Sequence, residues 1–170
     1  ELAWPEYDQL VRDGKTMVLL PIGALEQHGH HMSMNPDVLL PTAMAERVAR
    51  DIGALVAPAI AYGYKSQQKS GGGNHMPGTT SLDGLTLTST LKDVLKEFAR
   101  HGVRKVAMIN GHFENSMFIV EGVDLAIRGD WPMPDDSVAK LASTGLLADI
   151  SVAISEGEST TMLKPGAEMR

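Results

Sequence analysis

Histidines and carboxylates gather in two short stretches of this chain, each directly after an apolar run that ends in glycine. Glu26, His28 and then Asp37 follow the first run, whereas His112 and Glu114 follow the second. Carboxylate oxygens and imidazole nitrogens together suit Zn²⁺ or Mn²⁺. A bound pair of such cations lowers the pKa of a shared water and polarises a carbonyl group. These residue types therefore point to a metal-dependent hydrolase that acts on an amide-like bond.

Buried strands are the elements expected to position these side chains. The runs at Met17–Leu20 and Val103–Asn110 are short, apolar and bounded by turn residues, as buried strands are. Residues i and i+2 of an extended segment face the same side, so each Glu/His pair can face one point. Asp37, at the start of a predicted helix that Gly53 closes, is placed to bridge two cations.

Helices and strands alternate along the rest of the chain. Apolar spacing predicts helices at Trp4–Val11, from Asp37 to Gly53, from Leu87 to His101, from Met117 to Ile127, and at Ala139–Ser143. Further strands are predicted at Ala54–Tyr62, Thr79–Leu82 and Ile150–Ile154. This alternation predicts one α/β domain over residues 1–170, a three-layer sandwich whose mostly parallel central sheet is flanked by helices. Sites in such folds lie at the carboxyl ends of the strands.

Composition excludes several classes of protein. The chain has 170 residues, of which 43% are hydrophobic and 21% charged, as in a globular domain with a sizeable core. A formal net charge of −6 argues against nucleic acid as a partner. No apolar run approaches the roughly 20 residues of a membrane span. The absence of cysteine excludes thiolate metal sites and, with no signal-peptide pattern, predicts a cytoplasmic location.

A polar loop at Gly63–Gly78 is the second candidate for function, because long loops in compact domains often carry it. Its three consecutive glycines, 71–73, would let backbone N–H groups approach a small ligand. Ser70 beside them is a candidate substrate contact, and His75 either lines the pocket or faces solvent. His30 and His31 are each expected either to hydrogen-bond to a metal ligand or to be exposed to solvent.

Four segments together resemble the creatininase family: LPIGALEQHGHH, the Asp of MNPDVLLPTA, YGYKSQQKSGGGNHMPGTTSLDG and INGHFENS. The resemblance runs from Glu1 to Arg128 and implies an α/β fold with a dinuclear site of Zn²⁺ and Mn²⁺. It implies that one metal is held by Glu26, Asp37 and His112. The other would be held by His28, Asp37 and Glu114, with Asp37 bridging the two.

The same resemblance implies a reaction and an assembly. The reaction is reversible hydrolysis of the cyclic amide of creatinine to creatine by a metal-bridged hydroxide, with His112 and Glu114 in catalytic roles. Ser70 and Phe113 match positions that contact this small-molecule substrate, although the family's namesake carries Tyr in place of Phe113. Family members form homohexamers, in which loops of neighbouring subunits help to shape each site.

Residues 129–170 depart from the family pattern and predict a diverged or truncated end. The family carries a later Trp-Asp-x-x-His segment whose ring covers the substrate and whose His shuttles a proton, whereas no His follows His112 here. General acid–base assistance is typically worth about 10²–10⁴-fold in rate. Two alternatives therefore stay open: a non-catalytic metal-binding or assembly subunit, and a related hydrolase of another small cyclic or formyl amide.

Overall fold

The computed structural model describes residues 1–70, 72–130, 138–143, 150–155, 159 and 161. Along the chain the elements are α1 (Trp4–Val11), β1 (Met17–Ile22), α2 (Pro36–Ile52), β2 (Leu55–Val56), η1 (Gln68–Ser70), α3 (Gly84–Arg100), β3 (Lys105–Asn110), η2 (Phe113–Asn115), α4 (Ser116–Asp130), β4 (Val138–Ser143) and β5 (Ile150–Ser155). The η elements are single turns of 3₁₀ helix.

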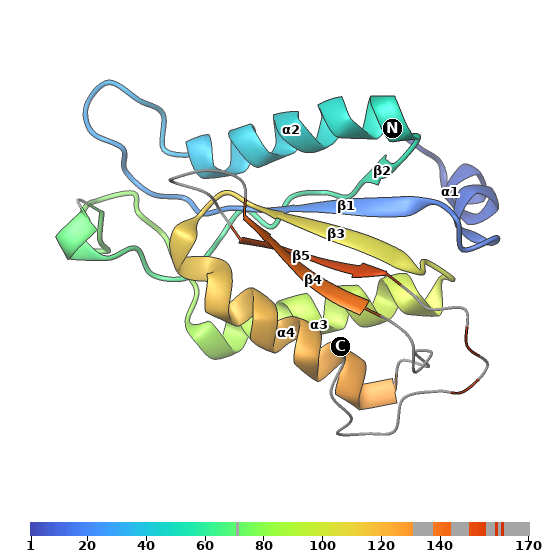
Figure 1. Ribbon diagram of the computed structural model, residues 1–170. Helices are drawn as coiled ribbons and strands as arrows, with labels where there is room; N and C mark the ends of the chain where they lie inside the picture. The colour runs from blue at the N-terminus through green and yellow to red at the C-terminus, as the bar shows by residue number, and fades with distance from the viewer. Residues whose placement is uncertain (71, 131–137, 144–149, 156–158, 160, 162–170) are drawn as a thin grey trace.

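A five-stranded sheet in the order β2-β1-β3-β5-β4 forms the middle layer (Figure 1). β1 pairs in parallel with both β2 and β3, and its partners on β3 run from Lys105 to Asn110. β5 pairs antiparallel with β3 and with β4. α2 covers one face of the sheet, and α3 and α4 cover the other. The predicted α/β sandwich with helices on both faces of a largely parallel sheet is confirmed.

The main hydrophobic core lies between the sheet and the helices α3 and α4. Leu87, Leu91 and Leu95 recur at every fourth position of α3, so they share one face of the helix and are fully buried. They belong to one cluster with Leu20 of β1 and Met108 of β3, which are direct partners in the sheet. Burying one such side chain stabilises the fold by about 1.5–3 kcal/mol. This packing fixes β1 against β3, and therefore fixes the positions of their ends.

Two predicted strands are shorter than the sequence pattern suggested. The segment predicted at Ala54–Tyr62 forms only β2, followed by a single bridge between Ile22 and Ile60. Pro58 lies between these two pairings and has no N–H to continue the ladder. The segment predicted at Thr79–Leu82 makes only two isolated bridges, to residues 25 and 64.

The helix predicted at Ala139–Ser143 is wrong, because this segment lies in strand β4. Every residue from Val138 to Ser143 is paired with a residue of β5. Ala, Lys and Leu favour a helix when they are judged alone, but pairing with a neighbouring strand overrides so short a local preference. The strand predicted at Ile150–Ile154 is confirmed as β5.

In the described part of the chain, the helices α1, α2, α3 and α4 lie where the apolar spacing predicted them. α2 begins with Pro36 at its first position and ends at Gly53, which has a left-handed φ of +69°. Asp83 caps α3 by accepting a hydrogen bond from the backbone N–H of Thr86. Within the described part of the chain, no helix combines the length and the apolarity that a membrane span requires.

Candidate metal centre

The carboxyl ends of β1 and β3 meet the first turn of α2 at one edge of the sheet, on the left of Figure 1. Glu26 and His28 come from the segment after β1, Asp37 is the second residue of α2, and His112 and Glu114 follow β3. We call these five residues the carboxylate–histidine cluster. Ligand atoms of Glu26, Asp37 and His112 all lie within 4.8 Å of one another.

The Asp37 carboxylate stands between the two imidazoles of the cluster. Its Oδ1 lies 3.2 Å from His28 Nε2, and its Oδ2 lies 3.0 Å from His112 Nδ1. The side chain is 13% exposed, so both contacts are largely shielded from water. A carboxylate that presents one oxygen to each of two neighbouring donors has the arrangement needed to bridge a pair of cations.

Glu26 and Glu114 complete the cluster from opposite sides of His112. Glu26 Oε1 lies 3.6 Å from His28 Nε2 and 3.9 Å from His112 Nδ1. Glu114 Oε2 lies 3.4 Å from His112 Nε2, and its Oε1 accepts a hydrogen bond of 3.2 Å from the backbone N–H of Gln67. The prediction that the second Glu/His pair shares an extended segment is wrong, because Glu114 lies in η2. The 3₁₀ turn still brings the two side chains together.

Two glycines allow Asp37 to approach both strand ends. A Cβ atom at Gly23 would lie 2.3 Å from the Asp37 carbonyl oxygen, and one at Gly111 would lie 2.1 Å from the same atom. Real Cβ atoms do not come this close to a backbone oxygen. The glycine that ends each apolar run therefore lets the first turn of α2 rest directly on the strand ends.

Two buried asparagines that the sequence analysis missed shape the end of β3. Asn110 is 3% exposed, donates to the His112 carbonyl oxygen at 2.7 Å and accepts from the His112 N–H at 3.2 Å. Asn115 is fully buried and bonds to Gly23 and Tyr64, which lie far away in the sequence. The repeated Asn of the NGHFEN segment was the available signal, because buried amides need partners.

The acids around His112 govern its protonation in the metal-free protein. Burial of this imidazole, which is 3% exposed, disfavours its charged form. The hydrogen bond to Asp37 and the negative charges of Glu114, Glu26 and Asp37 together outweigh that burial, so the pKa of His112 is raised above its ordinary value. The cluster therefore attracts positive charge, whether as a proton or as a cation.

One buried oxygen tests whether the cluster fits a metal ion. Glu26 Oε2 has no hydrogen-bond partner among the described residues, although it is fully shielded. A buried carboxylate oxygen without a partner is costly, and a cation would satisfy it. The donor set of three carboxylates and two imidazoles suits Zn²⁺ or Mn²⁺. The residues present therefore fit a metal site.

The polar loop passes close to Glu26 at Gly72. Ser66 is buried, and its hydroxyl accepts a hydrogen bond of 2.8 Å from the Gly73 N–H. A Cβ atom at Gly72 would lie 1.7 Å from Ser66 Oγ and 2.9 Å from Glu26 Oε2. Gly72 is therefore a place where only glycine lets the backbone pass this close to the cluster.

The other predicted site residues lie outside the cluster. Phe113 is 72% exposed directly beside His112, so its ring is open to a ligand arriving from solvent. Ser70 ends η1, close in sequence to Gln67 and Gly72, and its predicted substrate contact stays a prediction because its side chain lies outside the described part. The three remaining loop histidines, His30, His31 and His75, are exposed.

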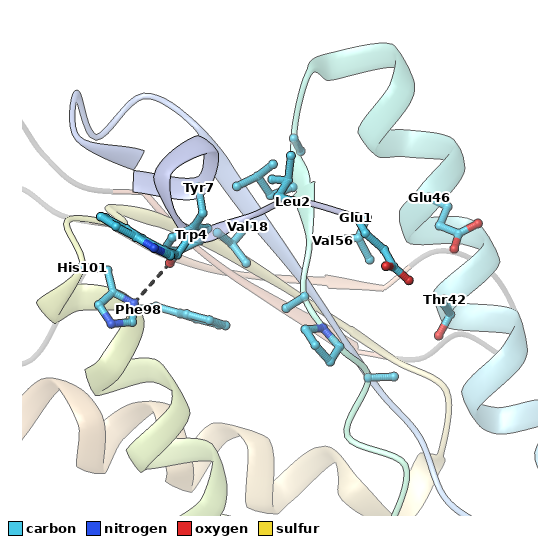
Figure 2. Close-up of a pocket in the computed structure, with 15 residues that line it drawn as sticks. Glu1, Leu2, Trp4, Tyr7, Val18, Thr42, Glu46, Val56, Phe98 and His101 are labelled. Atoms are coloured by element: carbon cyan, nitrogen blue, oxygen red, sulfur yellow. Dashed lines mark hydrogen bonds between the residues drawn. The ribbon is translucent and has the colours of Figure 1, made fainter. Parts of the chain in front are cut away.

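A separate cavity of about 1070 Å³ lies beside β2 (Figure 2). Its described lining includes Trp4, Tyr7 and Phe98 and contains no member of the carboxylate–histidine cluster. His101, the C-cap residue of α3, lines this cavity and meets the Tyr7 hydroxyl through Nδ1 at 3.3 Å. The sixth histidine of the chain thus caps a helix beside this cavity and is not a member of the cluster.

The chain belongs to the class of α/β proteins in which a polar site lies at the strand ends of a mainly parallel sheet. Its acids and imidazoles gather at those strand ends. The family described as creatininase, creatinine amidohydrolase, matches residues 1–160. This chain belongs to the creatininase family. The match reaches past Arg128, where the motif resemblance ended.

Individual relatives agree with the family assignment. The chain is 67% identical to the creatinine amidohydrolase of Pseudomonas putida over 128 residues, which cover 75% of this chain and 49% of the relative. A solved creatininase variant of Zn-Zn type has a TM-score of 0.74 at 66% identity, over 75% of this chain and 50% of that one. A solved manganese creatininase has a TM-score of 0.73 at 67% identity with the same coverage. The chain therefore spans about half the length of these relatives.

Proposed function

We propose that this chain is a metal-dependent amidohydrolase that hydrolyses the cyclic amide of creatinine to creatine. The observation that carries the proposal is the convergence of Glu26, His28 and His112 on Asp37, with a buried Glu26 oxygen that lacks a partner among the described residues. The family match and the identity to creatinine amidohydrolase support the substrate class. They favour a hydrolase over a non-catalytic binding subunit.

The cluster divides into two sets of donors that share Asp37. Glu26, Asp37 and His112 would hold one cation, since their ligand atoms already lie together. His28, Asp37 and Glu114 would hold the other. Zn²⁺ and Mn²⁺ are the proposed ions, supported by the donor chemistry and by relatives solved in Zn-Zn and Mn forms. When bound, such a pair supplies a water of lowered pKa and polarises the substrate carbonyl.

Glu114 is the residue we propose as the proton acceptor of the reaction. Its Oε1 is fixed by the Gln67 N–H, and its Oε2 is 3.4 Å from His112 Nε2. A carboxylate held in this way can take a proton from water at Oε2 while His112 orients it. The exposed ring of Phe113 and the Ser70 hydroxyl are the proposed contacts for the planar substrate ring.

We also propose an oligomeric assembly and a cellular location, from the family resemblance and the composition of the chain. The family resemblance supports a homohexamer in which loops of neighbouring subunits complete each site. The lack of cysteine supports a cytoplasmic location, and the net charge of −6 gives no basis for binding nucleic acid. The expected partner is therefore a small molecule and further copies of the chain.

The test is release of creatine from creatinine by the purified chain with added Zn²⁺ or Mn²⁺, together with metal binding by calorimetry. Glu114→Gln should lower the rate by about 10²–10⁴-fold, because the proposed proton acceptor is lost. Glu121→Gln, the same change at an exposed site on α4, is the control and should keep full activity. Metal binding without hydrolysis would reject the enzymatic proposal and leave a metal-binding protein.

A further inference from the structure

Asn115 has the least accessible polar side chain near the cluster, and its backbone N–H donates a hydrogen bond of 3.1 Å to the His112 carbonyl oxygen. Its Oδ1 accepts a hydrogen bond of 2.8 Å from the Tyr64 N–H. Its Nδ2 donates to the Gly23 carbonyl oxygen at 3.0 Å and to Asn110 Oδ1 at 3.3 Å. One buried amide thus joins the ends of β1 and β3 to the start of the polar loop.

The loop segment held by Asn115 touches His112 through its backbone. The Tyr64 carbonyl oxygen lies 3.1 Å from His112 Nε2. A carbonyl oxygen can only accept, and the other group near Nε2, Glu114 Oε2, is also an acceptor. The contact to the Tyr64 carbonyl is therefore a hydrogen bond only when Nε2 carries a hydrogen, and Nδ1, which faces Asp37 and Glu26, is then the nitrogen available to a cation.

The loop is closely packed at Gly63, the residue before Tyr64. A Cβ atom at Gly63 would lie 2.5 Å from the Gly23 carbonyl oxygen and 2.6 Å from Asn115 Oδ1. The chain before Tyr64 is therefore packed directly against the Asn115 amide and against the Gly23 carbonyl oxygen that this amide binds. Removal of the amide leaves the Tyr64 N–H and the Gly23 carbonyl oxygen without this partner. The loop then loses the hydrogen bond that holds the Tyr64 carbonyl against the His112 ring.

We propose that Asn115 is a positioning residue: it clamps the Tyr64 carbonyl onto His112 Nε2 and so commits Nδ1 to the metal. This inference rests on the proposed metal site and adds the group that selects the nitrogen. A hydrogen bond to the distal N–H of a metal-binding histidine fixes the ring orientation and raises its basicity. Loss of such a contact typically costs about 10–100-fold in metal affinity.

The test observes the ring directly in the metal-free protein by ¹H–¹⁵N NMR. In the wild-type protein His112 should show a slowly exchanging Nε2–H proton, because the Tyr64 carbonyl holds it in a buried site. Asn115→Ala should broaden or abolish this signal and lower Zn²⁺ affinity, measured by chelator competition, by about 10–100-fold. Asn115→Asp keeps the acceptor for the Tyr64 N–H, so it should retain more of the ring signal than Asn115→Ala.

A matched control separates positioning from loss of stability. Leu95→Ala removes a buried side chain of α3 away from the cluster, so it should lower the unfolding midpoint and leave the His112 ring signal unchanged. If Asn115→Ala does not fold, Asn115→Ser, whose shorter hydroxyl cannot span both partners, takes its place. A folded Asn115 variant with the wild-type ring signal overturns the proposal, as does loss of the signal in Leu95→Ala.

The NMR experiment distinguishes failure of the inference about Asn115 from failure of the proposed function. Failure of the wild-type chain to bind Zn²⁺ or to release creatine would reject the proposed function without altering the metal-free ring signal. A wild-type ring that carries its hydrogen on Nδ1 alone would reject the inference about Asn115, even if the enzyme were fully active.

Discussion

Substitution of Gly111 by Ala tests whether contact between the β3 end and α2 places Asp37. The added Cβ would lie 2.1 Å from the Asp37 carbonyl oxygen, and 2.7 Å and 2.9 Å from Pro41 Cγ and Cδ. All three atoms belong to the first turns of α2, so the helix start must move as a unit or the end of β3 must give way.

The size of the movement follows from these distances. Ordinary contact begins at 3.4 Å, so the carbonyl oxygen must retreat by about 1.3 Å from the Cβ atom. Metal–ligand distances tolerate only about 0.2 Å. Gly111→Ala should therefore withdraw the Asp37 carboxylate and reduce Zn²⁺ or Mn²⁺ affinity strongly, while overpacking costs about 1–3 kcal/mol of stability.

Calorimetric metal titration and urea unfolding measure the two effects separately. Gly53→Ala is the matched control, because Gly53 ends the same helix and a Cβ there meets nothing within 4 Å. Its φ of +69° makes Ala unfavourable by about 1–2 kcal/mol, so stability falls while metal affinity stays unchanged. A folded Gly111→Ala protein with wild-type metal affinity would refute the claim that this contact positions Asp37.

Two further predictions concern the loop and a helix cap. Gly72→Ala should lower metal affinity, because its Cβ would collide with Ser66 Oγ and press on Glu26. The double variant with Ser66→Gly should recover part of that affinity in the same titration, and no recovery would argue against this clash. At Asp83, the hydrogen bonds from the Thr86 N–H and then its hydroxyl lower the pKa of the carboxyl group. Its contribution to stability is therefore full above the unfolded-state pKa of about 3.9 and is lost as pH falls through the lower folded-state pKa. Asp83→Ala should thus lower urea stability at neutral pH but not in strong acid, and a difference independent of pH would contradict this account.

The strand ends and their ligand-type residues could be predicted because the relevant patterns are local. An apolar run that ends in glycine marks β1 and β3, and the intervening helices place both carboxyl ends at one edge of the sheet. The helix-start residues Asn35 and Pro36 allowed Asp37 to be placed at the start of α2. Local patterns failed at β4, where pairing with β5 decided the conformation.

The amino-acid sequence by itself determined which side chains could bind a metal and which edge of the sheet would carry them. Only the tertiary structure decided that each oxygen of Asp37 meets a different imidazole, and that the Tyr64 carbonyl meets His112 Nε2. Residues 64 and 112 are 48 positions apart, and the contact uses a backbone oxygen that every residue possesses. A periodicity in side-chain type cannot record such a contact, because it arises only when packing brings distant backbone segments together.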